Sequence, residues 1–347
     1  MSKKISVIIV DDAALVRALL SEILNSDPRI RVVGVAADPY EARELIKAKQ
    51  PDVMTLDIEM PKMNGIAFLK NIMRLRPMPV VMVSTLTQAG APATLEALSL
   101  GAVDFVAKPL SKGDAGLVEY RDILINKVIA AASANLAGFD HKAKKLTSAI
   151  PPSHQHLKSK FLCVIGASTG GTEAIKDVLM QMPEEAPPIM ITQHIPAAFS
   201  TSFAQRLDSC CRIKVLEAAQ NMPIKAGHAY LAPGDDHLRV TKSSYGLVCK
   251  LDKGPAVNRH RPSVEVLFHS AMEVMGANCV GVLLTGMGAD GSQALLDMRE
   301  SGCATIAQDE ATSVVWGMPG VAVKLGGAEK VLALDKIATA ILRHSYE

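Results

Sequence analysis

Short apolar runs rich in β-branched residues alternate with longer stretches of helical periodicity over residues 1–130. Runs of this kind, separated by helix-length segments, predict the strands of a parallel α/β sheet. The expected strands are Ile5–Val10, Arg31–Val35, Val53–Leu56, Pro79–Ser84 and Val103–Ala107. The pattern therefore predicts a first domain, residues 1–130, with a doubly wound, five-stranded parallel sheet whose ligands bind at the carboxyl ends of the strands.

The pattern stops at residues 131–159, which we interpret as a linker. The stretch from 138 to 160 carries five lysines, one acidic residue and a Pro-Pro pair, with few apolar side chains. Chain segments of this composition lack the apolar surface that a packed element needs. A second domain is expected to follow at residues 160–347.

Alternation of strand and helix patterns resumes in this second domain. Strands are expected at Phe161–Gly166, Pro188–Thr192, His228–Ala232, Val280–Leu284 and Ala304–Ala307, and helices at Thr172–Met182, Phe199–Ser209, Pro262–Met275 and Asp290–Ser301. The order predicts an open, Rossmann-like α/β sheet, with antiparallel additions around Leu238–Leu251.

Composition narrows the class of protein. Hydrophobic residues make up 49% of the chain, and 37 basic and 35 acidic residues leave a net charge of only +2, so we expect no nucleic-acid partner. The N-terminal apolar run is too short for a signal peptide, and no run reaches the roughly 20 residues of a membrane span. Six scattered cysteines without a CxxC motif are expected to be reduced. These features predict a cytoplasmic protein that does not insert into membranes.

Chemically active side chains follow the expected strands of the first domain. Asp11 and Asp12 follow the first strand, Asp57 the third, Ser84 ends the fourth, and Lys108 follows the fifth. In a parallel sheet all of these positions meet at one edge. Clustered carboxylates suit Mg²⁺, and a carboxylate held against Mg²⁺ can attack a phosphoryl group. The sequence therefore predicts a phosphorylatable aspartate at this edge.

The segments VIIVDDAALVR, LDIEMPKMNG, VVMVSTLT and DFVAKP closely resemble the response-regulator receiver domain across about 125 residues. This resemblance implies a histidine kinase as phosphodonor. It also implies roles for individual residues: Asp57 as phosphoacceptor, Asp11 and Asp12 as further holders of Mg²⁺, Ser84 as switch hydroxyl, Phe105 as switch aromatic and Lys108 as phosphoryl sensor.

The second domain opens on a glycine-rich turn, GASTGG, at residues 166–171. Such a turn between strand and helix can bind a phosphate through its N–H groups, or it can present Ser168 as a nucleophile. A serine nucleophile needs a base and an orienting acid. His194 and Asp290 each follow another expected strand and are the best candidates. Alternatively, Asp290 caps the helix beginning at Gly291.

Two further alternatives concern this turn and its acid. Asp235 and Asp236, in APGDDH, are weaker competitors of Asp290 for the orienting role. A nucleotide-binding turn would require an acidic residue about 20 residues further on, and neither His194 nor its neighbours supply one. A DNA-binding output domain would need a basic recognition helix, which the near-neutral charge does not favour.

The segments GASTGG, QHIP, LAPGDDH, RPSVEVLF, LLTGMGADG and QDEATSVVWGMP resemble the catalytic domain of chemotaxis protein-glutamate methylesterases. The resemblance implies hydrolysis of glutamate γ-methyl esters on chemoreceptors with release of methanol, deamidation of receptor glutamines, and activation by phosphorylation. Ser168 would be the nucleophile, His194 the base and Asp290 its orienting acid. We expect no cofactor in this domain. From their place in glycine-rich turns, the N–H groups of Thr169, Met287 and Gly288 are expected to bind the oxyanion.

Overall fold

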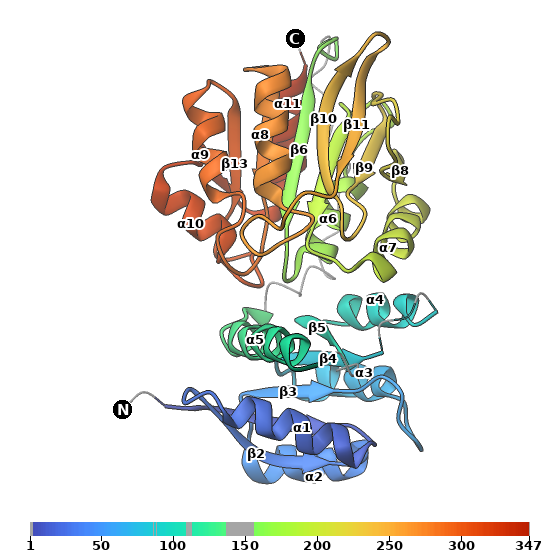
Figure 1. Ribbon diagram of the computed structural model, residues 1–347, viewed down its shortest axis with the longest axis vertical. Helices are drawn as coiled ribbons and strands as arrows, with labels where there is room; N and C mark the ends of the chain where they lie inside the picture. The colour runs from blue at the N-terminus through green and yellow to red at the C-terminus, as the bar shows by residue number, and fades with distance from the viewer. Residues whose placement is uncertain (1–2, 86, 88, 109–112, 137–155, 347) are drawn as a thin grey trace. The chain divides into compact units, whose positions relative to one another are not determined.

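The computed structural model describes residues 3–85, 87, 89–108, 113–136 and 156–346. The chain divides into two compact units, Met1–Phe139 and Asp140–Glu347 (Figure 1). The boundary between them falls among residues 137–155, outside the described residues. The expected boundaries at 1–130, 131–159 and 160–347 therefore stay predictions.

The first unit contains a five-stranded parallel sheet, which confirms the expected architecture. Its order is β2-β1-β3-β4-β5, with strands β1 (Ile5–Val10), β2 (Ile30–Ala36), β3 (Val53–Leu56), β4 (Val80–Ser84) and β5 (Asp104–Ala107). The connecting helices are α1 (Ala14–Asn25), α2 (Pro39–Lys49), α3 (Gly65–Leu75), α4 (Ala91–Ser99) and α5 (Gly113–Ala132). The strand order reverses between β1 and β3, so the loops after these two strands open onto a shared crevice.

Local sequence explains where two of these helices begin. The Asp38 side chain accepts hydrogen bonds from the N–H groups of Tyr40 (2.9 Å) and Glu41 (3.0 Å), and Pro39 occupies the first turn of α2. The Asn64 side chain likewise accepts from Ala67 N at 2.8 Å ahead of α3. Both caps satisfy backbone donors that a helix start leaves unpaired.

The second unit contains a seven-stranded parallel sheet in the order β14-β13-β12-β6-β7-β9-β8. Its strands are β6 (Leu162–Ala167), β7 (Ile189–Gln193), β8 (Lys214–Glu217), β9 (His228–Leu231), β12 (Cys279–Leu283), β13 (Ala304–Gln308) and β14 (Lys330–Leu332). A separate antiparallel hairpin, β10 (His237–Ser243) and β11 (Gly246–Asp252), matches the antiparallel addition expected near Leu238–Leu251. The open α/β fold is confirmed, while β8 and β14 were not predicted.

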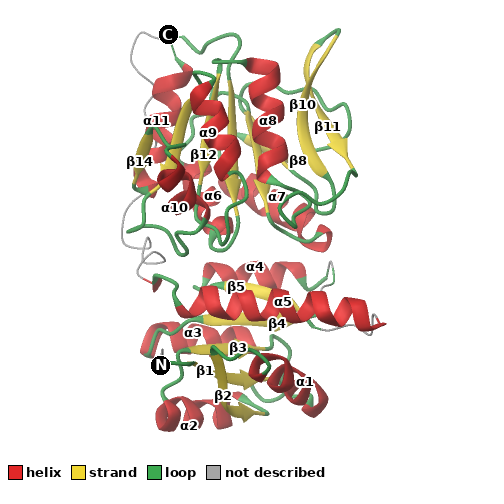
Figure 2. Ribbon diagram, turned by 60° about the vertical axis from the view of Figure 1, so that its left-hand side comes forward, coloured by secondary structure: helices red, strands yellow, loops and turns green. Residues whose placement is uncertain are grey.

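Helices cover both faces of this sheet (Figure 2). They are α6 (Gly171–Met180), α7 (Ala197–Cys210), α8 (Val264–Met275), α9 (Ser292–Glu300), α10 (Met318–Leu325) and α11 (Leu334–Ser345). Helix α6 contacts α7 and α11, whereas α9 contacts α8 and α10. In a right-handed crossover, the direction in which the chain crosses the sheet decides which face its helix covers. The chain moves from β6 to β7 through α6 and, in the opposite direction, from β12 to β13 through α9, so these two helices lie on opposite faces. The strand order reverses between β6 and β12, which marks a second crevice.

The core of the second unit joins the sheet to the hairpin. Buried side chains of β6, β12, α8 and the hairpin form one cluster that includes Val164, Leu238, Cys249, Phe268 and Leu283. The hairpin packs on α8 through β10. Among the described residues, no helix combines the length and the apolar character needed to cross a membrane.

Candidate functional site

Three carboxylates gather at the crevice of the first unit, as expected. Asp11 and Asp12 follow β1, and Asp57 follows β3; one ligand atom from each lies within 4.8 Å of the others. Asp11 and Asp57 are buried and Asp12 is exposed. Oxygen donors in this number and at this spacing fit Mg²⁺, which prefers carboxylates together with water.

Lys108 bridges two of these carboxylates. Its Nζ atom lies 2.8 Å from Asp11 Oδ2 and 2.8 Å from Asp57 Oδ2. Burial raises the pKa of Asp57 to about 6, although the Lys108 ammonium opposes this change. The Asp57 carboxylate is only 2% exposed, and among the described residues its charge is stabilised by this cation and by the Ile58 N–H, which donates to Oδ1 at 2.8 Å.

Ser84 lies on β4, the strand next to β3, and Phe105 lies on β5, the edge strand beyond it. Ser84 ends β4, and its carbonyl accepts a hydrogen bond from Lys108 N at 2.8 Å. Its hydroxyl lies 3.4 Å from that of Thr94. Phe105 is buried, with Lys127 Nζ 5.0 Å from the centroid of its ring. Ser84 and Lys108 are therefore neighbours at the acidic crevice, while the switch roles of Ser84 and Phe105 stay predictions.

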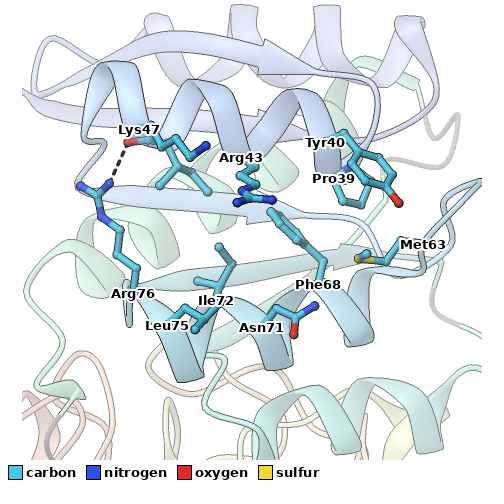
Figure 3. Close-up of a pocket in the computed structure, with 11 residues that line it drawn as sticks. Pro39, Tyr40, Arg43, Lys47, Met63, Phe68, Asn71, Ile72, Leu75 and Arg76 are labelled. Carbon is cyan, nitrogen blue, oxygen red and sulfur yellow. Dashed lines mark hydrogen bonds between the residues drawn. The ribbon is translucent and has the colours of Figure 1, made fainter.

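A cavity of 420 Å³ lies elsewhere in the first unit, between α2 and α3 (Figure 3). Tyr40 and Phe68 line it together with aliphatic side chains, and Arg43, Lys47 and Arg76 add positive charge. None of the predicted site residues is among its lining residues. The cavity is therefore separate from the acidic crevice.

In the second unit, Ser168 lies in the tight turn between β6 and α6. Its N–H donates to Thr285 O at 3.0 Å, and its carbonyl accepts from Gln193 Nε2 at 2.9 Å. Gly170 has a φ of 77°, and a Cβ atom there would lie 2.6 Å from Val314 Cβ. The turn thus requires a glycine at this position and fixes the Ser168 backbone from two neighbouring strand ends.

His194 occupies the corresponding position on the neighbouring strand. Ala167 pairs with Gln193 in the β6–β7 ladder, and His194 N donates to Ala167 O at 3.1 Å. The next positions along the two strands are Ser168 and His194. The His194 Nε2 atom lies 2.8 Å from Asp290 Oδ2, whereas Nδ1 is buried and has no hydrogen-bond partner within the described part of the chain.

Asp290 follows β12 and accepts several hydrogen bonds. Besides His194, its donors are Asn258 Nδ2 (2.9 Å), Ser263 Oγ (2.8 Å) and Val264 N (2.7 Å). Burial opposes ionisation of Asp290, but the bonds from His194, Asn258 and Ser263 prevail and lower its pKa to about 2. Asp290 is therefore a permanent carboxylate at ordinary pH.

The alternative role of Asp290 as cap of its own helix is wrong. Helix α9 begins at Ser292 without a side-chain cap bond. The Asp290 carboxylate instead accepts from Val264 N, at the start of α8. A negative charge at a helix N-terminus is favourable. Since His194 pairs with Asp290, Asp235 and Asp236 do not occupy the acid position.

The turn after β12 approaches Ser168 closely. A Cβ atom on Gly286 would lie 2.8 Å from Ser168 Cβ. In the described chain, the N–H groups of the next two residues, Met287 and Gly288, donate to no backbone carbonyl. Gly288 has a φ of 86°, and a Cβ atom there would have no atom within 4 Å. In the described chain, Met287 and Gly288 therefore offer N–H donors near Ser168. Nothing comparable is observed for the Thr169 N–H. The oxyanion roles of all three residues stay predictions.

Three residues around Ser168, His194 and Asp290 had no direct signal in the sequence. Ser263 and Asn258 bond to Asp290, and the His260 ring stacks on the His194 ring with centroids 3.7 Å apart. None of them lies at the end of a parallel strand, which is the rule that identified Ser168, His194 and Asp290. The RPSVEVLF segment did mark the start of α8, where Ser263 lies.

Comparison with known proteins covers both units. Residues 163–341 match the family described as CheB methylesterase, and residues 7–116 match the response regulator receiver domain. Protein-glutamate methylesterase/protein-glutamine glutaminase 2 of Saccharophagus degradans is 59% identical over 99% of this chain and 99% of its own length. Protein-glutamate methylesterase/protein-glutamine glutaminase of Hydrogenovibrio crunogenus is 51% identical over 98% of each chain. The crystal structure of the Thermotoga maritima CheB methylesterase catalytic domain matches with a TM-score of 0.52 and 36% identity, covering 54% of this chain and 99% of that one.

Proposed function

The chain belongs to the CheB methylesterase family, and on that basis we propose that it is a phosphorylation-activated hydrolase of glutamate γ-methyl esters on chemoreceptors. Hydrolysis releases methanol, and the same site deamidates receptor glutamines, which present an amide in place of the ester. The observation that carries the proposal is the 2.8 Å hydrogen bond between His194 and Asp290, together with the β6–β7 ladder that places Ser168 and His194 at its next two positions. These three side chains are the parts that a serine hydrolase requires.

The hydrogen bond between His194 and Asp290 sets the direction of proton transfer. The ionised Asp290 accepts the Nε2–H proton of His194, which leaves the lone pair on Nδ1. Nδ1 then accepts the hydroxyl proton of Ser168 while Oγ attacks the ester carbonyl. The resulting imidazolium, stabilised by Asp290, returns the proton to the leaving methoxide, or to the leaving amine of glutamine.

A second half-reaction clears the acyl-enzyme. His194 Nδ1 removes a proton from water, hydroxide adds to the acyl carbonyl, and the bond to Ser168 Oγ breaks as Oγ regains a proton. The developing oxyanion accepts hydrogen bonds from the N–H groups of Met287 and Gly288, joined by that of Thr169. Fixed donors of this kind act without reorganisation during the reaction. No cofactor enters this scheme.

We assign regulation of the esterase activity to the first unit. Asp57 accepts a phosphoryl group from a chemotaxis histidine kinase, and Asp11, Asp12 and Asp57 hold Mg²⁺. Mg²⁺, when bound, supplies positive charge to the phosphoryl oxygens. Lys108 neutralises a further oxygen, and the Ser84 hydroxyl and Phe105 respond to the modified Asp57. The six free cysteines fit the cytoplasm, where the kinase and the methylated receptor segments are expected to meet the enzyme.

The decisive experiment follows methyl groups on a methylated receptor by mass spectrometry. We expect wild type to remove them, faster after treatment with acetyl phosphate and Mg²⁺, and Ser168→Ala to remove none. Asp57→Asn should keep the basal rate and lose the response to acetyl phosphate. Ser209→Ala, which deletes a hydroxyl in α7 bonded to Arg206 O, serves as matched control and should behave as wild type. Loss of methyl groups that survives Ser168→Ala would overturn the assignment.

A further inference from the structure

A tight turn at residues 257–260 reaches the triad from outside the sheet. Val257 and His260 exchange two backbone hydrogen bonds, His260 N to Val257 O at 2.9 Å and Val257 N to His260 O at 3.0 Å. The two central residues, Asn258 and Arg259, have φ values of 51° and 67°. Two consecutive positive φ values are typical of a type I′ turn, and they are uncommon for an arginine. Conformations of this kind persist where the surroundings hold them, often at functional sites.

Asn258, the first of the two central residues of this turn, contacts Asp290. Asn258 Nδ2 donates to Asp290 Oδ1 at 2.9 Å, while Asp290 Oδ2 lies 2.8 Å from His194 Nε2. The two carboxylate oxygens are therefore engaged by different groups. Asn258 and Ser263, whose Oγ donates to the same Oδ1 atom at 2.8 Å, together oppose rotation of the carboxylate away from the imidazole.

His260, the last residue of this turn, contacts His194. The His260 ring stacks on the His194 ring at a centroid distance of 3.7 Å and an angle of 11° between the planes. The hydrogen bond to Asp290 holds His194 at one atom only, so the ring could still tilt about that contact. A parallel ring in van der Waals contact removes this freedom and fixes the direction of Nδ1. It also presents a π face to the imidazolium formed during turnover.

We infer that Asn258 and His260 form a positioning clamp for the catalytic triad, with Asn258 fixing the Asp290 carboxylate and His260 fixing the plane of the His194 imidazole. The inference rests on the proposed esterase function. Neither residue touches the reacting atoms, and both act through the triad. The clamp lowers the barrier because small misplacements of a base from its nucleophile are costly in rate.

The kinetic test compares two substitutions at one position. His260→Ala removes the stacked ring and should lower kcat roughly 10- to 100-fold, the range expected for a misaligned base, with little change in KM. His260→Phe restores a flat ring and should keep kcat within about threefold of wild type, since stacking requires only an aromatic face. His228→Ala is the matched control, because it removes another stacked histidine at the start of β9, the opposite end of the strands from the triad. It should leave kcat unchanged.

A second measurement does not depend on turnover. In wild type, the His194 Nε2–H proton bonded to Asp290 should give a resolved, downfield imidazole signal in proton NMR spectra of the full chain. We expect this signal to broaden in His260→Ala and in Asn258→Ala and to remain sharp in His260→Phe and His228→Ala. A wild type without esterase activity that shows this pattern would refute the proposed function and leave the clamp standing.

Three outcomes overturn the clamp. The first is a wild-type kcat together with a sharp NMR signal in His260→Ala. The second is an equal loss of kcat in His260→Ala and His260→Phe. The third is a loss of activity in His260→Ala that appears only as a higher KM. The last would indicate a role in substrate binding in place of positioning.

Discussion

Asp57 and Asp290 are both buried carboxylates at strand ends, yet their pKa values move in opposite directions. Burial raises the pKa of Asp57 to about 6, and Lys108 and the Ile58 N–H are the partners of this carboxylate in the described part of the chain. Asp290 is as deeply buried, but its hydrogen-bond donors lower its pKa to about 2. Environment, not residue type, therefore prepares one carboxylate as a reactive group and the other as a fixed charge.

The raised pKa of Asp57 predicts that ionisation of this residue destabilises the first unit. Its ordinary value is 3.8 and its folded value about 6. The folded state thus binds the proton more tightly, and this stabilisation is complete below pH 3.8 and is lost as pH rises through 6. The full difference is about 3 kcal/mol of unfolding free energy, at about 1.4 kcal/mol for each pH unit. Chemical denaturation between pH 4 and 7.5 in EDTA measures it.

Asp57→Asn is the control for that titration, because an amide does not ionise and carboxylates remote from the acidic crevice titrate equally in both proteins. We expect the wild type to lose stability relative to Asp57→Asn as pH rises from 4 to 7. A constant difference between the two proteins over this range would contradict the prediction.

The sequence identified the candidate site residues that directly follow a parallel strand, and it could not identify the others. Ser168, His194 and Asp290 follow β6, β7 and β12, so a pattern of apolar runs was enough to bring them together. Asn258 and His260 depend on a turn whose central pair, Asn-Arg, lacks the glycine that usually marks type I′ geometry. The capping role of Asp290 was misassigned because the helix that it caps, α8, is distant in sequence.

At the scale of elements, both sites use a point where strand order reverses. Asp11 and Asp57 flank the reversal between β1 and β3, and Ser168 and Asp290 flank that between β6 and β12. Helix starts then approach these crevices closely. In the first unit, Gly65 begins α3, and a Cβ atom there would lie 1.9 Å from the backbone oxygen of Asp57.

This close approach predicts that Gly65→Ala disturbs the phosphoacceptor. The added methyl group must displace either α3 or the end of β3, and overpacking of this kind costs about 1–3 kcal/mol. We expect lower stability and slower labelling by acetyl phosphate, read by denaturation and by the mass of the phosphorylated protein. In Gly34→Ala the nearest atoms, at 3.0 Å, belong to the flexible end of Leu45, so this control should be milder. Wild-type labelling in Gly65→Ala would show that the close approach is not required.

Two short edge strands were missed by the sequence analysis, and so was the helix α11. Strands β8 and β14 span only Lys214–Glu217 and Lys330–Leu332 and lie at the two edges of the sheet. Strand β8 begins with an exposed Lys214, and β14 has only three residues with Val331 exposed, so neither has the long buried run of a central strand. Helix α11 has a clear amphipathic pattern, with Leu334, Ile337 and Ile341 buried, and that signal could have predicted it.

At the scale of the whole molecule, each unit has its own sheet, its own core and its own site. The relatives described above match this chain over nearly its full length, and so over both units. A phosphoryl group on Asp57 can change the rate at Ser168 only through a shift between two states of the molecule that differ in activity. The gain is limited by how strongly phosphorylation favours one state over the other.

We therefore expect residues 155–347 alone to hydrolyse methyl esters faster than the unphosphorylated full chain, because the inhibiting state cannot form without the receiver. Methanol release at equal protein concentrations measures this. Acetyl phosphate should raise the rate of the full chain and leave that of the fragment unchanged. Equal rates for the fragment and the unphosphorylated chain would contradict inhibition by the receiver.

The pairing of Ala167 with Gln193 has a consequence for the lifetime of the active arrangement. Because Ser168 and His194 are the next positions of this ladder, their separation follows the spacing of two central strands. Central strands open with close to the global free energy of unfolding, whereas loops open locally at little cost. Ser168 and His194 should therefore stay aligned through the local fluctuations that open surface loops, and they should separate only when the sheet itself unfolds.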